Sequence, residues 1–177
     1  MVEDGRWRFG DDPYVAPLSE RDPATRLRGR LAAPVTVWTT YDESGEAVGV
    51  TISSLVVLSG DHPAVLGVLQ PLSEFWEAAQ ESGRFVVHVL PAGELRLAEA
   101  FAGRYPGASP FPPATARSDW GPVLPQPMTR AYCRPERVLD EDGPVLVRAA
   151  IDDLELQDDA DPLVHFRGRY FSLAPPH

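Results

Sequence analysis

Residues 47–78 read AVGVTISSLVVLSGDHPAVLGVLQPLSEFWEA, and this stretch decides the fold. Its first apolar run follows VTVWTTY and the polar turn DESGE, so residues 35–53 have the pattern of a β-hairpin. Residues 54–69 repeat the arrangement, with residues 60–63 as the turn. Thr51, Ser53 and Ser54 interrupt the apolar runs, although a packed core gains nothing from hydroxyl groups. The stretch therefore predicts two consecutive hairpins with a polar site between them.

Three short helices are expected beside these strands. Ser73 is a candidate N-cap for EFWEAAQES, and Gly83 stands where that helix would stop. GELRLAEAFAG predicts a second helix that ends at Gly103, and Asp22 with Pro23 is a start signal for RDPATRLRGRL.

The rest of the chain adds further strands. RFVVHVL, the two runs around the turn DEDG, and PLVHFRGRYFSL predict β structure and bring the total to six to eight strands. Residues 104–127 hold seven prolines and predict a long irregular surface segment. We expect an irregular arm over residues 1–20 and a single domain over residues 21–177. The fold class is mainly β, an antiparallel barrel or sandwich with short helices.

Composition limits the partners and the location. The chain has 177 residues and a formal net charge of -10, with no window rich in basic residues, which disfavours nucleic acid and anionic membrane surfaces. One cysteine, Cys133, excludes an internal disulfide. The acidic N-terminus does not resemble a signal peptide and no apolar run approaches bilayer length, so we expect a cytoplasmic protein.

Motifs of residue-based catalysis are absent from the sequence. It contains no HExxH, CxxC pair, GxSxG, phosphate loop or dinucleotide fingerprint. His88 lies among β-branched residues and is interpreted as structural. The acidic run DDLELQDDADP lacks the ligand spacing of a calcium loop. We therefore expect no metal site and no catalytic side chain.

The order and spacing of these segments resemble the flavin reductase-like family, whose members have the FMN-binding split-barrel fold. The resemblance runs from about residue 27 to residue 173. It comprises APVTVWTT, GVTISSLVVLSGDHPAVLGVL, ESGRFVVHVL, LAEAFAG and PLVHFRGRY. It implies a six-stranded antiparallel Greek-key split barrel with short flanking helices.

The same resemblance implies a function and its cofactors. It indicates an oxidoreductase that uses NAD(P)H to reduce FMN or FAD and supplies reduced flavin to a separate monooxygenase. Hydride transfer from a nicotinamide to a flavin needs no side-chain acid or base, which agrees with the missing catalytic motifs. The flavin-binding residues are expected to be Thr51, Ser53, Ser54, Ser59, Gln70 and Ser73. A homodimer is also implied, because split-barrel relatives generally build the flavin pocket across a two-fold interface.

His165 and Tyr170 are the expected contacts on the nicotinamide side. Family members frequently place a histidine directly before x-G-x-Y, whereas this chain has Phe166 there and His165 one residue earlier. Neighbouring residues of a strand face opposite sides, so His165 would face away from the family's position. Two alternatives therefore remain open: a flavin-binding protein without efficient hydride transfer, and a split-barrel protein for another ligand such as haem or a deazaflavin.

Overall fold

The structure, a computed structural model, describes residues 2–3, 6–7, 22–70, 73–139, 143–158 and 161–173. Within the predicted N-terminal arm it describes two short strands, β1 (Val2–Glu3) and β2 (Arg6–Trp7), which pair with each other. The other residues of the predicted arm lie outside the described part. The division into an arm and one domain stays a prediction.

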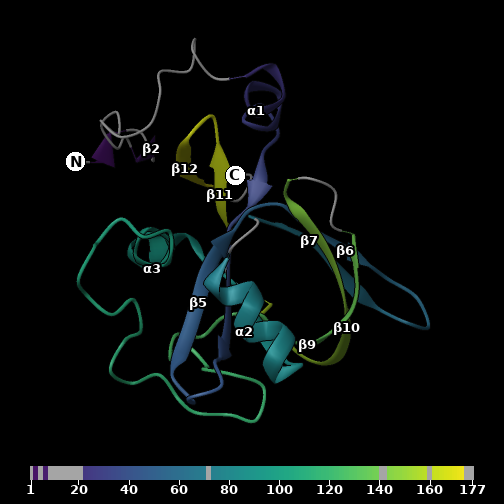
Figure 1. Cartoon of the computed structure of the whole chain (residues 1–177). Helices are drawn as coiled ribbons and strands as arrows, with labels where there is room; N and C mark the ends of the chain where they lie inside the picture. The colour runs from purple at the N-terminus through teal and green to yellow at the C-terminus, as the bar shows by residue number, and fades with distance from the viewer. Residues whose placement is uncertain are drawn as a thin grey trace.

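A seven-stranded antiparallel sheet with the order β5-β4-β8-β9-β10-β7-β6 forms the body of the molecule (Figure 1). Its strands are β4 (Thr36–Tyr41), β5 (Ala47–Ile52), β6 (Leu55–Leu58), β7 (Ala64–Leu69), β8 (Phe85–Val89), β9 (Arg130–Leu139) and β10 (Val145–Glu155). Both hairpins predicted from residues 35–69 are confirmed by the β4–β5 and β6–β7 pairings.

The two edge strands of this sheet are consecutive in the chain. Only Ser53 and Ser54 separate β5 from β6, so one bent strand pairs with β4 on one side and with β7 on the other. The sheet therefore curls into a barrel of six strands when the bent strand is counted once. This confirms the predicted six-stranded antiparallel barrel, and it places the hydroxyl cluster at the bend that closes it.

A second, smaller sheet lies above the barrel in Figure 1. It combines β3 (Ala33–Pro34), β11 (Leu163–Phe166) and β12 (Arg169–Ser172) with β1 and β2, in the order β1-β2-β12-β11-β3. The β11–β12 hairpin is the one predicted from PLVHFRGRYFSL.

The predicted helices are present but short. They are α1 (Pro23–Arg28), α2 (Glu74–Ser82) and α3 (Leu95–Phe101), which is preceded by the 3-10 turn η1 (Ala92–Glu94). Asp22 caps α1, because its carboxylate accepts a hydrogen bond of 3.0 Å from the Thr25 N–H. Gly83, with φ 65°, ends α2 in the left-handed conformation that glycine adopts without strain.

Aromatic packing on α2 and the concave side of the sheet forms the larger core. Trp38 stacks on Phe85 with ring centroids 5.0 Å apart, and Phe75 of α2 meets both rings edge-on. A Cβ on Gly67 would lie 2.3 Å from Trp38 Cη2, so the ring occupies the space of a missing side chain. This packing fixes α2 against the barrel.

A second core lies on the other side of β4, under α3. Phe101 of α3 packs there with Val37, Leu124 and Leu163, and Tyr170 packs against its margin. Leu124 belongs to residues 104–127, which form no helix or regular strand, as the prolines predict. This segment nevertheless contributes buried residues and is more than a surface excursion.

Candidate functional site

The bend between β5 and β6 is held to β7 by Ser54. Its carbonyl accepts a hydrogen bond of 3.2 Å from Val68 N–H, and its hydroxyl donates one of 3.0 Å to Val68 O. Gln70, two residues beyond Val68, is exposed where β7 ends. The hydroxyl of half-buried Ser53 has no hydrogen-bond partner among the described residues. The bend before Gln70 thus carries two hydroxyl groups: that of Ser54 makes a hydrogen bond, and that of Ser53 makes none among the described residues.

Ser73 lies at the N-terminus of α2. It occupies the N-cap position, yet its side chain makes no capping hydrogen bond. Its carbonyl accepts from the N–H groups of Trp76 and Glu77, whereas the N–H groups of Glu74 and Phe75 have no partner within the helix. Since α2 packs beside β5, a free hydroxyl and two amides lie at the positive end of a helix near the barrel bend.

Thr51 has a different neighbour from the other predicted residues. Its hydroxyl donates a hydrogen bond of 2.7 Å to the Ala98 carbonyl of α3. A hydroxyl has one proton, so neither Thr51 nor Ser54 donates to a ligand phosphate while these bonds exist. The two hydroxyl groups instead hold the backbone of α3 and β7.

Ser59 is separated from the other predicted flavin contacts. The β6–β7 register pairs Leu55 with Gly67 and Leu58 with Ala64, so Ser54 and Ser59 lie at opposite ends of the hairpin. Ser59 is exposed in the turn. Gln70 and Ser73 follow the end of β7 that is bonded to the bend, whereas Ser59 lies at the other end of β6.

The two residues predicted for the nicotinamide side lie together. His165 and Tyr170 are paired across the β11–β12 hairpin without a register shift, and their rings are 5.4 Å apart. The Tyr170 hydroxyl donates to the Glu99 carboxylate of α3; burial, and then the Glu99 charge, raise the pKa of Tyr170 to about 12. Burial, helped by the charge of Arg28, lowers the pKa of His165.

The side-chain orientation expected for His165 is present. Phe166 pairs with Arg169, so it faces the opposite side of the hairpin from His165 and Tyr170. His165 therefore does not occupy the position of the family's histidine.

Sequence reasoning missed three groups around this site: the Ala98 carbonyl, Glu99 and Arg28. Glu99 and Ala98 come from α3, which meets β5 and β12 only through the tertiary fold. No local pattern marks a backbone carbonyl as a partner, and Glu99 reads as an ordinary helix residue.

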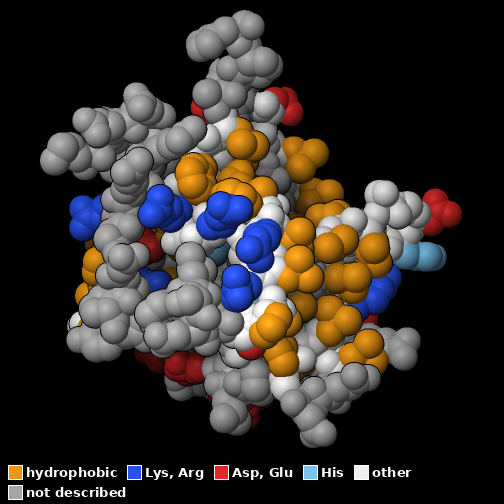
Figure 2. Space-filling view, turned by 90° about the horizontal axis from the view of Figure 1, so that it is seen from above, with side chains coloured by type: hydrophobic (Ala, Val, Ile, Leu, Met, Phe, Trp, Pro, Cys, Tyr) orange, Lys and Arg blue, Asp and Glu red, His pale blue; other side chains and the backbone are white. Residues whose placement is uncertain are grey.

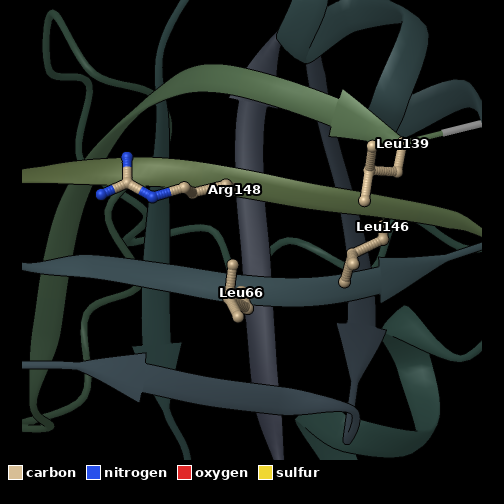
Figure 3. A pocket seen from close by; sticks show the side chains of 4 residues that line it. All are labelled: Leu66, Leu139, Leu146 and Arg148. Atoms are coloured by element: carbon tan, nitrogen blue, oxygen red, sulfur yellow. The ribbon is translucent and has the colours of Figure 1, made fainter.

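A shallow hollow lies elsewhere, on the outer face of the sheet. Leu66, Leu139, Leu146 and Arg148 line it, and its volume is about 220 Å³ (Figure 3). That is below the ordinary range of small-molecule pockets, about 300–1,000 Å³. It coincides with none of the predicted site residues, and it forms part of an apolar face.

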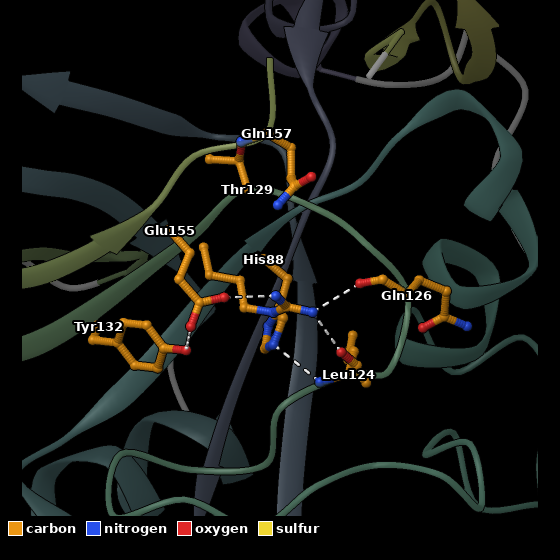
Figure 4. A network of polar contacts seen from close by, with 8 residues as sticks. His88, Leu124, Gln126, Thr129, Tyr132, Glu155 and Gln157 are labelled. Atoms are coloured by element: carbon orange, nitrogen blue, oxygen red, sulfur yellow. Dashed lines mark hydrogen bonds and ion pairs between the residues drawn. The ribbon is translucent and has the colours of Figure 1, made fainter. Parts of the chain in front are cut away.

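A buried polar network anchors residues 121–127 to the barrel (Figure 4). Arg130 donates to the carbonyls of Leu124 and Gln126, each at 2.7 Å, and to Glu155 at 2.8 Å. The Tyr132 hydroxyl also donates to Glu155. His88 lies in the same network between two backbone groups, so the structural interpretation of this histidine fits its surroundings.

The bent barrel, the α2 terminus and the polar bend define a split-barrel protein of the flavin-binding class. The family model "Flavin reductase like domain" matches residues 28–174, and the chain belongs to this family. The match covers the whole barrel and confirms the family suggested by the sequence.

Named relatives extend over nearly the full chain. The reductase subunit HsaB of a flavin-dependent monooxygenase from Rhodococcus jostii is 28% identical, covering 94% of this chain and 85% of the relative. The NADH-dependent FMN reductase AsuE2 from Streptomyces nodosus subsp. asukaensis is 32% identical, covering 85% and 84%.

Solved structures of related reductases have the same fold. Nitrilotriacetate monooxygenase component B from Mycobacterium thermoresistibile superposes with a TM-score of 0.76 at 29% identity, covering 85% of this chain and 84% of the other. The styrene monooxygenase flavin reductase from Pseudomonas putida S12 superposes with a TM-score of 0.78 at 24% identity, covering 88% and 100%. The predicted NAD(P)H:flavin oxidoreductase class is confirmed, with flavin and a reduced pyridine nucleotide as its cofactors.

The residues around the bend fit a flavin. A phosphate accepts hydrogen bonds, and Ser73, Ser53 and the first amides of α2 are donors without a hydrogen-bond partner among the described residues. Exposed Glu74 is adjacent, and its charge opposes a phosphate unless the carboxylate points to solvent.

Among the described residues no helix is long and apolar enough to span a membrane.

Proposed function

We propose that this protein is the reductase component of a two-component oxygenase system, in which NADH reduces FMN and the reduced flavin passes to a separate monooxygenase. The family match over residues 28–174 is the observation that carries the proposal. The named activities of HsaB and AsuE2 support the monooxygenase partner and the choice of NADH and FMN. The cytoplasmic location expected from the sequence is part of the same proposal.

The residues of this chain bind the flavin and orient it. Ser73 and the N–H groups of Glu74 and Phe75 hold the phosphate at the start of α2, where the helix dipole favours an anion. Ser53 and Gln70 contact the polar parts of the flavin along the bend. When bound, the flavin supplies the hydride-accepting ring, so the protein needs no side-chain acid or base for that step.

Thr51 and Ser54 support this arrangement through hydrogen bonds to neighbouring elements. Thr51 ties β5 to α3, and Ser54 ties the bend to β7. Tyr170, held by Glu99 on the same helix, keeps His165 beside α3 on the nicotinamide side.

Anaerobic spectroscopy tests the activity. The purified protein with FMN should show a bound flavin spectrum that bleaches rapidly when NADH is added. A stable flavin spectrum that neither NADH nor NADPH changes would favour the alternative of a binding protein, for which the displaced His165 is the supporting observation. Failure to bind flavin would overturn both.

The phosphate site is tested by Ser73→Ala. Because the Ser73 side chain makes no capping bond, its removal should leave the stability of α2 nearly unchanged. The loss of a hydrogen bond to a charged group should raise the Kd for FMN about tenfold. Riboflavin, which has no phosphate, should bind the variant and the parent equally. Ser59→Ala is the matched control, and an equal effect of both variants would refute the assignment.

The predicted homodimer has a candidate interface on the outer face of the sheet. Apolar side chains point outward there, and we call them the apolar surface: Val56, Leu58, Leu66, Val68, Leu139 and Leu146. Val56 is 58% exposed and Leu139 is 45% exposed. This surface includes β6, which begins directly after Ser54, so a second copy packed on it would lie next to the flavin site. An exposed apolar face of this kind suits a two-fold interface.

Sedimentation analysis tests the dimer. The parent protein should sediment as a dimer, and Val56→Arg should shift it to the monomer, because two guanidinium groups would be buried in the interface. Leu154→Arg places the same charge at an exposed leucine of β10 outside the apolar surface, and it should leave the dimer intact. A monomeric parent would refute the homodimer.

A further inference from the structure

Two arginine-bearing segments meet above the barrel. The N–H of Arg167 in the β11–β12 turn donates a hydrogen bond of 2.8 Å to the Gly29 carbonyl at the end of α1. Arg28 and Arg30 flank Gly29, and Arg169 follows Arg167 by two residues. We call Arg28, Arg30, Arg167 and Arg169 the arginine cluster. Residues far apart in the sequence thus form one basic site that no single window of the sequence contains.

The cluster concentrates positive charge on an acidic chain. The sequence has 16 basic residues, all of them arginine, against 26 acidic ones. All four cluster members are exposed, and none of them has an ion-pair partner among the described residues. Arg104, Arg130, Arg134 and Arg148, in contrast, each pair with a carboxylate. Figure 2 shows arginine side chains gathered in the middle of this face of the molecule.

The turn between β11 and β12 determines where the Arg167 backbone lies. Arg167 has φ 51° and Gly168 has φ 76°, so two successive residues adopt the left-handed conformation in the turn. Positive φ at both central residues is the type I′ geometry usual for a two-residue hairpin turn, and it places the Arg167 backbone beside the end of α1. None of the side chains of α1 is buried, so packing into the core is not what holds this helix in place.

The cluster lies beside the proposed nicotinamide side. The positive charge of Arg28 acts on His165, and His165 and Tyr170 belong to the hairpin whose turn carries Arg167. The Arg167 guanidinium lies 5.3 Å from the centre of the Phe166 ring, on the face of the hairpin opposite His165, so Arg28 is the member of the cluster that adjoins the nicotinamide side. A cationic site next to the nicotinamide position suits the part of a dinucleotide that extends away from its reacting ring. Guanidinium groups bind phosphate oxygens with two parallel hydrogen bonds.

We infer that the arginine cluster binds the diphosphate of an adenine dinucleotide, and that this dinucleotide is the NADH substrate. The inference rests on the proposed reductase function. FMN carries a single phosphate, which the start of α2 already serves, so the cluster is not needed for FMN. On a chain of net charge -10 it also attracts an anionic substrate that the rest of the surface repels.

Steady-state kinetics with FMN and NADH test the inference. Arg28→Gln and Arg167→Gln should each raise the KM for NADH about threefold to tenfold, while kcat changes less than about twofold, because only binding is lost. Raising the salt concentration from about 20 to about 200 mM should increase the KM of the parent for NADH. The double variant that combines Arg28→Gln with Arg167→Gln should lose most of this dependence. Arg134→Gln removes one exposed arginine elsewhere and should change neither quantity.

Direct binding separates the possible sources of the diphosphate. ADP-ribose carries the diphosphate and the adenosine without a nicotinamide. Its Kd should be at least about tenfold lower for the parent than for the double variant. FMN should bind both proteins equally. Weaker binding of FAD with an unchanged KM for NADH would assign the cluster to the flavin and overturn the inference.

The failure of this inference differs from that of the proposed function. A parent protein that does not reduce FMN with NADH refutes the function. A parent that reduces FMN, with arginine variants identical to it in KM and in ADP-ribose binding, refutes the arginine cluster alone.

Discussion

Acidification should destabilise the fold through His88, because this buried imidazole has no room for a second proton. Its Nε2 lies 3.3 Å from the Leu124 N–H, and its Nδ1 lies 3.2 Å from the Val37 carbonyl. A backbone N–H only donates, so Nε2 accepts, and the ring proton sits on Nδ1 and is donated to Val37 O. Protonation of Nε2 would place two N–H groups against each other and remove the bond to Leu124.

The pKa of His88 gives the size of the effect. Burial lowers it from 6.5 to about 3, and the charge of Arg130 acts in the same direction. Between these values the unfolded chain holds a proton that the folded protein lacks, so stability is complete above about pH 6.5 and falls as the pH decreases through this window. By linkage, the free energy of unfolding should be about 2 kcal/mol lower at pH 5 than at pH 8 from this residue alone.

The assay is urea unfolding of the parent and of His88→Gln at both pH values. A glutamine amide donates and accepts but does not titrate, so the difference in unfolding free energy between the two proteins should shrink by about 2 kcal/mol from pH 8 to pH 5. Contributions from other groups, such as His165, are present in both proteins and cancel. Parallel pH profiles would refute the reasoning, and so would an NMR titration in which folded His88 takes up a proton near pH 6.

Two further predictions concern the packing that positions the site. Gly67→Ala should lower the free energy of unfolding by about 1–3 kcal/mol, because the new methyl group would overlap the Trp38 ring; thermal unfolding measures it, and an unchanged Tm would contradict the close contact. Arg130→Lys should cost about 2 kcal/mol or more, since the guanidinium bonds Glu155 through Nη1 and the carbonyls of residues 124 and 126 through Nη2, and the single nitrogen of an ammonium does not span both positions. Proteolysis of the variant should then cut within residues 104–127 faster than in the parent, and equal cutting rates would show that this network does not hold the segment.

The sequence predicted the elements well because their signals are local. Alternating apolar residues, the DESGE turn and the caps at Asp22 and Gly83 act within a few neighbours, and the hairpins and helix ends follow them. The barrel was predicted through the family resemblance, and its closure depends on the bend at Ser53 and Ser54 that the hydroxyl residues mark.

The candidate site was predicted less completely, because hydrogen-bond partners come from distant elements. Thr51, Ser53 and Ser54 look equivalent in the sequence, yet only Ser53 keeps an unengaged hydroxyl. Ser59 was expected among the flavin contacts with them, but the β6–β7 register places it at the far end of the hairpin. Glu99 gave no local signal at all.

The hydroxyl cluster therefore has two physical causes. A strand that leaves one neighbour and joins another passes through a bend where its backbone groups lack regular partners, and such groups are costly to bury unpaired. At this bend the Ser54 carbonyl accepts the Val68 N–H, and the hydroxyls of Thr51 and Ser54 tie the two sides of the bend to the carbonyls of Ala98 in α3 and Val68 in β7. Ser53 and Ser73 remain unengaged, and both lie where the barrel edge meets the start of α2. These two hydroxyl groups make no hydrogen bond among the described residues, and the proposed flavin site is built on them for that reason.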